Sequence, residues 1–456
     1  MEWIVAIGMV VPAVWLAINR SSWLLDYTIA ILAFNRGIRR IVDYYSNGQF
    51  NPFSPISLTP LLVAGLLLIP ALMHFGRLSK RVRIPFFLLA GALAIGFAVG
   101  LPSNQFAAIY SLAEWVSALA AMAFAATHPA GRQTADRWIK SAGWAAMGVA
   151  GYGWWQYYTI PPWDGMWLVE SGMVGYMGQP EPKMMTVFST LNERGPCGTF
   201  LAWAVIPMII NPRWRNAGGW ASIALLLWGI VLTETRSNLI VIAVVALLYP
   251  ALSKGRGIGR LLILAALVVA GATWGIERIP GMEKMKERFE GESLFGESSS
   301  LQGRLAIYEY GLADIARNPL GLGLGSSGMG RRAQGETIQS IGDSGYIQVL
   351  AQFGWAGSLL FFGGLYAIWK ELGLRWRAGR QALGAEVVDP FIPATRAILL
   401  ATLVFLFVGD IFAGFSLLWI FFGRVLSLPA DPAVLIRLRY LLAQKAAVSS
   451  PAQPTA

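Results

Sequence analysis

The chain has 456 residues, of which 55% are hydrophobic and 13% are charged, and its mean hydropathy is +0.54. A soluble protein of this length carries about 25% charged residues, so the composition excludes an ordinary soluble fold. The net charge of +11 would suit nucleic-acid binding in a soluble protein. In a membrane protein it indicates cytoplasmic loops rich in Lys and Arg, and we expect no nucleic-acid partner.

The sequence predicts an all-α integral membrane protein with about twelve transmembrane helices, because its apolar runs can cross a hydrocarbon core of roughly 30 Å. The predicted spans are 3–19, 57–75, 84–101, 106–127, 138–155, 196–210, 218–233, 238–252, 259–276, 343–369, 395–409 and 411–427. We expect residues 1–440 to form one polytopic domain. Residues 441–456 are expected to be a disordered cytoplasmic tail.

Residues 22–34 (SWLLDYTIAILAF) are apolar but short, contain Asp26, and allow two interpretations. If they cross the membrane, there are thirteen spans and the N-terminus lies outside. If they lie in the membrane interface, the count stays at twelve, and we favour this. It leaves Arg36, Arg39 and Arg40 on the non-cytoplasmic side, as interfacial anchors or phosphate contacts.

The connections between the spans alternate in charge. Basic residues fill every second connection, as in Arg77, Lys80, Arg81 and Arg83; Arg132, Arg137 and Lys140; Arg213 and Arg215; Lys254, Arg256 and Arg260; and Lys370, Arg375, Arg377 and Arg380. The intervening connections at 102–105, 234–237 and 410 carry few or no cations. The positive-inside rule therefore predicts a multi-pass protein with the basic connections and both termini in the cytoplasm.

Three non-cytoplasmic segments are long, covering residues 20–56, 156–195 and 277–342. The second contains WWQYY and PPWDGMW, aromatic runs that suit the membrane interface or sugar stacking. The third is too long for a structureless loop, so we expect a partly helical cap with a function.

Within the third segment, LQGRLAIYEYGLADIARNP predicts a helix followed by Pro319. The predicted apolar face consists of Leu305, Tyr308, Leu312 and Ile315.

Four local clusters with polar residues are assigned to the same, non-cytoplasmic face. They are FSTLNERGPCG (188–198), TETRSN (233–238), GRLAIYEYGLADIARNPLGLGLGSSGMG (303–330) and GDSGYIQVLAQFGWAG (342–357). Arg236 could merely snorkel to the interface, Arg304 could be a surface residue, and Asp343 could be an N-cap. The convergence of several arginines and one carboxylate on one face favours a functional site.

The Gly-rich run GLGLGSSGMG lacks the preceding strand and the following Lys-Ser/Thr of a nucleotide-binding loop. Its glycines are expected to allow close backbone approach and unusual dihedral angles. The single cysteine, Cys197, excludes an intrachain disulfide and a multi-cysteine metal site. We expect no metal and no cofactor.

These motifs resemble the bacterial O-antigen ligase and polysaccharide polymerase superfamily. The resemblance rests on FSTLN, TETRSNLI, GRLAIYEYGLADIARNPLGLGLGSS and DSGYIQVLAQFGWAG, and it covers residues 185–370 directly. It implies a metal-independent, inverting glycosyltransferase in the bacterial inner membrane that acts on the periplasmic face. The implied donor is a glycan on undecaprenyl diphosphate. The implied partners are a glycan or lipid A-core acceptor, a flippase and a chain-length regulator.

The resemblance also implies roles for individual residues. Arg236 and Arg304 would hold the diphosphate, because guanidinium groups bind such oxygens in bidentate fashion and neutralise the leaving group without Mg²⁺. Asp343 would complete the catalytic set. Further candidates for contacts with the diphosphate or glycan are Arg194, Tyr308 and Tyr346. Arg39 and Arg40 are weaker candidates for the same contacts.

The sequence departs from the ligase pattern at the proposed base. Ligases carry a histidine near the start of the span after the large loop, whereas this chain has Asp343 there and no histidine beyond His128. A carboxylate can deprotonate a sugar hydroxyl if desolvation raises its pKa. The replacement favours a polymerase of exopolysaccharide or O-antigen repeat units, with a ligase as the alternative. A transporter or flippase, the third alternative, would predict two matching halves, and none is visible.

Overall fold

The computed structural model describes residues 1–253, 299–326, 344–383, 389–407, 409, 417–437 and 440, with the backbone alone for residues 299–307 and 383. The described helices are α1 (Glu2–Ile18), α2 (Trp23–Asn47), η1 (Pro55–Leu58), α3 (Thr59–Gly65), α4 (Leu68–Phe75), α5 (Lys80–Thr127), α6 (Arg132–Thr159), α7 (Pro162–Glu170), α8 (Val174–Met177), η2 (Ser189–Leu191), α9 (Arg194–Ile210), η3 (Pro212–Trp214), α10 (Gly219–Leu232), α11 (Arg236–Ser253), α14 (Ser299–Arg317), α16 (Gly345–Leu383), α17 (Phe391–Phe405) and α18 (Leu417–Ser427). The predicted span 259–276, the predicted tail 441–456 and Asp343 lie outside the described residues.

The described part is helical, as the composition predicted, with one isolated β-bridge between Gly178 and Met185. Within it, four helical segments are long and apolar enough to cross a membrane: 55–75, 80–127, 236–253 and 345–382. Shorter apolar helices such as α9 and α10 match predicted spans in position. Helices suit a bilayer because they satisfy their own backbone polar groups. The count of twelve spans stays a prediction.

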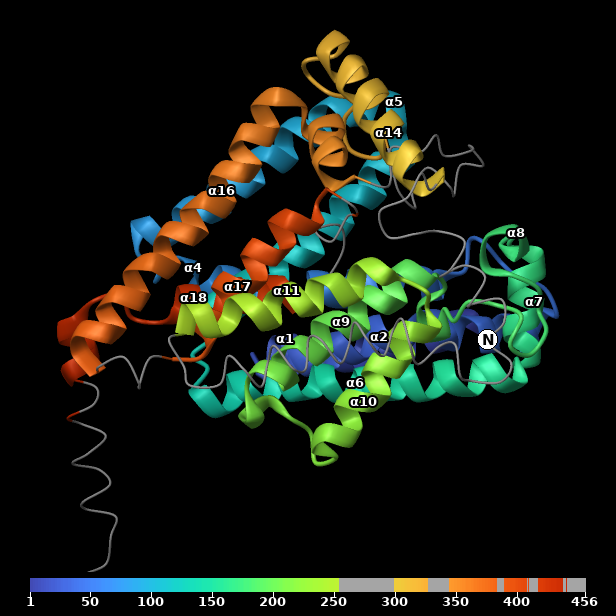
Figure 1. Cartoon of the computed structure of the whole chain (residues 1–456), viewed down its shortest axis with the longest axis horizontal. Coiled ribbons are helices and arrows are strands. Elements are labelled where there is room, and N and C mark those ends of the chain that lie inside the picture. Colours follow the sequence, from blue (N-terminus) through green and yellow to red (C-terminus); the bar gives the residue numbers. More distant parts are fainter. Residues whose placement is uncertain are drawn as a thin grey trace, which may run out of the picture.

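Helix α16 packs along α5, and the two form an arm that rises from the rest of the molecule (Figure 1). Below this arm, α2, α6, α9 and α10 form a bundle, with α11 and α17 packed against each other beside it (Figure 1). Helix α14 covers the far end of the arm (Figure 1).

Residues 22–34, which are expected to lie in the membrane interface, belong to a long helix, and their position relative to a membrane stays a prediction. They form the first half of the 25-residue helix α2, which is buried against α1 and α6. Asp26 made a buried helix look unfavourable, but Arg137 of α6 pairs with its carboxylate at 2.9 Å, and Ser141 donates a hydrogen bond to it. A buried carboxylate becomes acceptable once it is paired and hydrogen-bonded. The expected loop over 20–56 is therefore largely helix.

Contacts at the two ends of α2 relate the N-terminus to the rest of the bundle. The Glu2 carboxylate accepts a hydrogen bond from the Asn51 side chain at 3.1 Å, and the neighbouring backbone N–H of Phe50 donates to Glu170. Residue 2 therefore lies at the same end as the segment 156–195, whereas Asp26 lies with Arg137 at the other end. Helix α2 is not among the described helices that are long and apolar enough to cross a membrane, so whether it crosses stays a prediction.

Helix α5 contains the two predicted spans 84–101 and 106–127, separated by a break at Gln105 (φ 39°, ψ −111°). Both halves contact the same residue of α16. Gly96 from the first half lies against the Phe353 ring, and Trp115 from the second half lies 5.6 Å from it, between ring centroids. The chain therefore folds back at Gln105, as the tight connection at 102–105 predicted.

The Gly-rich run packs its backbone directly against α5 and α16. The backbone N–H of Leu324 donates to the Gly96 carbonyl at 2.8 Å, and that of Leu322 donates to the Ala351 carbonyl at 2.7 Å. Gly323 has φ 78°, and a Cβ there would lie 2.1 Å from the backbone N of Gly100. The expectation of close approach and unusual dihedral angles is confirmed for the described part of this run.

We expect Gly323→Ala to lower the free energy of unfolding by about 2–3 kcal/mol, because the methyl group meets backbone atoms and the residue has positive φ. Gly48→Ala is the matched control, since Gly48 has φ 64° and nothing within 4 Å of the added Cβ. It should cost only about 1 kcal/mol. Thermal unfolding in detergent measures both; equal losses would show that the contact with Gly100 is unimportant.

The helix predicted from LQGRLAIYEYGLADIARNP is present as α14, which ends at Arg317 before Pro319. Its predicted face is partly wrong. Ile315 is buried, but Leu312 is 45% exposed. Gly311 instead faces Ile347 of α16, because a glycine lets the two helices approach closely.

Candidate functional site

The first turns of α9 and α11 meet in a polar cluster that includes two of the predicted site arginines. Arg194 begins α9 and Arg236 begins α11. The contact is close because Gly198 has no side chain; a Cβ there would lie 2.1 Å from the Thr235 hydroxyl oxygen. Asn238 donates to that same hydroxyl at 2.9 Å, which fixes the turn before α11.

The cluster combines arginine side chains with the carboxylate of Glu234. The Arg194 guanidinium lies 3.9 Å from the Glu234 carboxylate and 4.3 Å from the centroid of the Tyr176 ring. Arg194 and Arg236 are both half-buried, and Arg236 is also engaged in a polar interaction. The starts of two helices add their partial positive charge to the two guanidinium groups. The structure therefore brings Arg194 and Arg236 onto neighbouring helix ends.

Arg40, by contrast, is fully enclosed. Its Nε lies 2.7 Å from the Asp164 carboxylate, and its other nitrogens donate to the Asn192 side chain and the Ser189 carbonyl. The guanidinium carbon also lies 5.0 Å from the centroid of the Phe188 ring. The side chain has no exposed surface, so a diphosphate cannot reach it in this structure. We leave Arg40 out of the proposed site.

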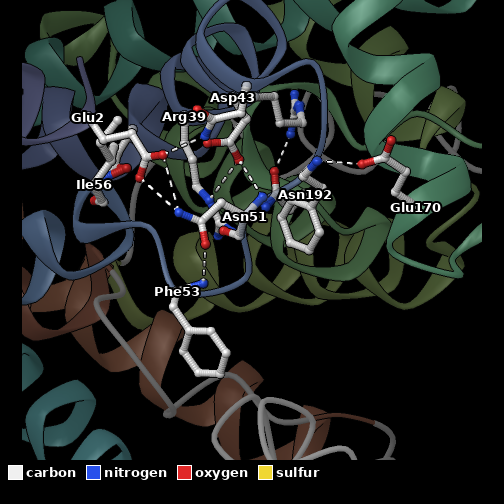
Figure 2. Close-up of polar contacts among 12 residues, drawn as sticks. Glu2, Arg39, Asp43, Asn51, Phe53, Ile56, Glu170 and Asn192 are labelled. Atoms are coloured by element: carbon white, nitrogen blue, oxygen red, sulfur yellow. Dashed lines mark hydrogen bonds and ion pairs between the residues drawn. The ribbon is translucent and has the colours of Figure 1, made fainter.

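Arg39 belongs to a second structural network (Figure 2). Its Nε lies 3.4 Å from the Asp43 carboxylate, its Nη2 donates to the Asn51 carbonyl, and its guanidinium lies 4.6 Å from the centroid of the Phe50 ring. Figure 2 shows Asn51 between Arg39 and Glu2. Arg39 therefore joins α2 to the start of α1, and we leave it out of the proposed site as well.

Tyr308 and Tyr346 come together at the C-terminal end of α17. Ser344 donates a hydrogen bond to the Tyr308 hydroxyl at 2.8 Å, and this hydroxyl donates to the Phe407 carbonyl at 3.1 Å. The Tyr346 hydroxyl donates to the Leu403 carbonyl at 2.7 Å. Both tyrosines thus join helices α14 and α16 to α17.

The structure does not describe the side chains of the two remaining predicted site residues, Arg304 and Asp343. The contacts of Tyr308 and Ser344 involve the segments that contain them. Arg304 lies one helical turn before Tyr308 on α14, and Asp343 directly precedes Ser344 in the sequence. The hydrogen bond between Ser344 and Tyr308 joins the two segments that carry them. The roles of Arg304 and Asp343 stay predictions.

The sequence interpretation missed a polar group between α2 and the second half of α5. Arg36 donates to the Leu191 carbonyl at 3.0 Å, and the charges of Arg36 and Glu114 both act on the Tyr110 side chain. Glu114 is the one charged residue in the run 106–127. An ionisable residue within an apolar span usually has a function or a fixed partner, so this signal was available in the sequence.

The fold and the polar cluster describe a helical membrane protein with arginines gathered at one end of the bundle. Residues 221–362 match the family model described as O-antigen ligase. This match confirms, over these residues, the resemblance to the O-antigen ligase and polymerase superfamily. The matched segment contains Arg236, Arg304 and Asp343. Searches of curated proteins and of solved structures gave no significant match.

Proposed function

We propose that the protein is a glycosyltransferase that moves a glycan from a polyprenyl diphosphate to the hydroxyl of an acceptor sugar. The observation that carries the proposal is the O-antigen ligase match, which spans all three predicted catalytic residues. The meeting of Arg194 and Arg236 at two helix starts supports it, because such an arrangement attracts a diphosphate.

In this reaction the acceptor oxygen attacks the anomeric carbon of the donor, and the bond from that carbon to the diphosphate oxygen breaks. The acceptor proton passes to a base, and the polyprenyl diphosphate leaves with the bonding electrons. Arg236 and Arg304 stabilise the negative charge that develops on the leaving oxygens. Asp343 is the proposed base. In-line attack inverts the configuration at the anomeric carbon and requires no metal ion.

The proposal includes a topology. The cation-rich end of the bundle, with Arg137, faces the cytoplasm, and the end with Arg194 and Arg236 faces the periplasm. Glu2 lies with the segment 156–195, so the N-terminus belongs on the periplasmic side, opposite to the orientation expected from twelve spans. The protein would reside in the bacterial inner membrane.

The proposed transfer reaction fits either a polymerase or a ligase, and these two enzymes differ in their acceptor. In a polymerase, the acceptor is the terminal sugar of a second lipid-linked repeat unit of exopolysaccharide or O-antigen. In a ligase, it is lipid A-core. We favour the polymerase, because an acidic residue replaces the histidine of ligases in the sequence DSGYIQ. Purified protein given only lipid-linked repeat units should form a ladder of lengthening products. A product that forms only when lipid A-core is added would identify a ligase.

Asp343→Asn should lower the rate of glycan transfer by about 10²–10⁴-fold, because the amide cannot accept the acceptor proton. Glu114→Gln is the comparison, since Glu114 is a carboxylate within an apolar run and is an alternative base. It should retain transfer within about tenfold of the wild type. The measurement is initial rate with purified, reconstituted protein. If Glu114→Gln lost far more transfer activity than Asp343→Asn, Glu114 would be the base instead.

A further inference from the structure

A second cationic site lies at the other end of α16, away from the proposed transfer site. A cavity of about 410 Å³ opens there between α5, α16 and α17. Four basic side chains line it: Arg81 from α5, Lys370 and Arg377 from α16, and Arg396 from α17. We call it the cationic cavity. At a rise of ~1.5 Å per residue, Arg377 lies ~35 Å along the helix from the kink at Gly354.

Among the described residues, the charge in the cationic cavity is only partly neutralised. The buried carboxylate of Glu371 is shared between Arg81, at 2.5 Å, and Arg375. Within the part of the chain that the structure describes, the other three cations that line the cavity have no carboxylate partner; these are Lys370, Arg377 and Arg396. The described residues that line the cavity therefore carry a net positive charge.

Arg396 is held in place by an aromatic ring rather than by a carboxylate. Its guanidinium carbon lies 4.6 Å from the centroid of the Trp369 ring. Its Nε is buried and has no hydrogen-bond partner among the described residues. A buried donor without a partner costs free energy, so an anion that accepts from it would be favoured.

An exposed apolar strip on α16 leads to the cationic cavity. Leu359 is 75% exposed and Tyr366 is 60% exposed. Lys370 and Arg377 are also exposed, and all four lie on one face because the spacings of 7, 4 and 7 residues are close to whole helical turns. Along this face, apolar side chains are followed by cations. A phospholipid has the same order, with acyl chains followed by a charged headgroup. The ring of Tyr366 also lies 5.3 Å from the Lys370 nitrogen, at the boundary.

We propose that the cationic cavity binds the headgroup of an anionic glycerophospholipid, whose acyl chains lie along Leu359 and Tyr366. The phosphodiester oxygens accept hydrogen bonds from Arg396, Lys370 and Arg377. Basic pockets between transmembrane helices are suited to such headgroups. The adjoining apolar strip favours a lipid over a free anion, because acyl chains can pack on the strip whereas a free phosphate has no apolar part. This site is distinct from the transfer site and does not depend on the proposed function.

The test compares lipid retention by the full-length protein. Protein in vesicles of equal parts dioleoylphosphatidylglycerol and dioleoylphosphatidylcholine is extracted into mild detergent, and bound lipid is counted by native mass spectrometry. The wild type should retain phosphatidylglycerol in preference to phosphatidylcholine. The double variant Lys370→Gln/Arg377→Gln should lose about 25-fold in phosphatidylglycerol affinity, at about fivefold per cation. Both side chains are exposed, so the fold should not suffer.

The matched control is Arg132→Gln/Lys140→Gln, which removes two exposed cations from α6 at the same end of the bundle. It should retain the lipid like the wild type. If the control lost as much bound phosphatidylglycerol, the lipid would be held by general attraction to cations at this end of the protein, and the proposal would be overturned. Equal retention of the two lipids would overturn it too. Displacement of the lipid by millimolar inorganic phosphate would identify a free-anion site instead.

Discussion

Arg236→Ala and Arg304→Ala should each lower glycan transfer by about 10²–10³-fold while the protein remains folded in the membrane. The leaving diphosphate gains negative charge as the glycosidic bond breaks, and each arginine would stabilise that charge with two parallel hydrogen bonds. Arg304→Lys should also lose most activity, because an ammonium group cannot reproduce the planar fork. Initial rates with a lipid-linked donor in reconstituted vesicles measure the effect.

Two control substitutions remove the same charge elsewhere. Arg317 is exposed in the last turn of α14, the helix that carries Arg304, and Arg213 is exposed in η3. Arg317→Ala and Arg213→Ala should transfer at rates close to the wild type. If these controls lost as much activity as Arg236→Ala, the loss would reflect overall charge rather than contact with the diphosphate.

The helices were largely predictable because each apolar run is a local property of the sequence. The runs 196–210 and 218–233 correspond closely to α9 and α10. The burial of helix α2 was harder to predict because its stability depends on a distant residue: Asp26 is acceptable in a buried helix only when Arg137, far along the chain, pairs with it. A one-dimensional pattern of hydropathy contains no information about such a partner.

The candidate site was predictable to a smaller extent. The sequence motifs predicted that Arg194 and Arg236 belong to one site, and the structure places them at the starts of adjacent helices. Arg39 and Arg40 belonged to the same hypothesis, yet their guanidinium groups are used inside the fold. The same residue type serves both purposes, and only the tertiary contacts distinguish a buried structural arginine from one at the edge of a polar cluster.

Arg40→Met should lower the free energy of unfolding by about 3–5 kcal/mol, because it leaves a buried carboxylate without its counter-charge. Asp164 would keep hydrogen bonds from Tyr152, at 2.8 Å, and Gln156, at 2.5 Å, but it would have lost its ion pair. The measurement is denaturant unfolding in mixed micelles. Transfer should fall only in proportion to the amount of folded protein, unlike the loss expected for Arg236→Ala.

The double variant Arg40→Met/Asp164→Leu separates the cost of an unpaired charge from a loss of packing. With both charges gone, part of the stability should return, because no unpaired charge is buried, although Tyr152 and Gln156 lose their acceptor. The site suits this replacement because aromatic rings already surround it, with the Arg40 guanidinium 5.5 Å from the centroid of the Trp167 ring. If the double variant regained stability but not transfer, Arg40 would contact the substrate after all. Recovery of both would establish that its role is to hold α2 against the segment that leads into α9.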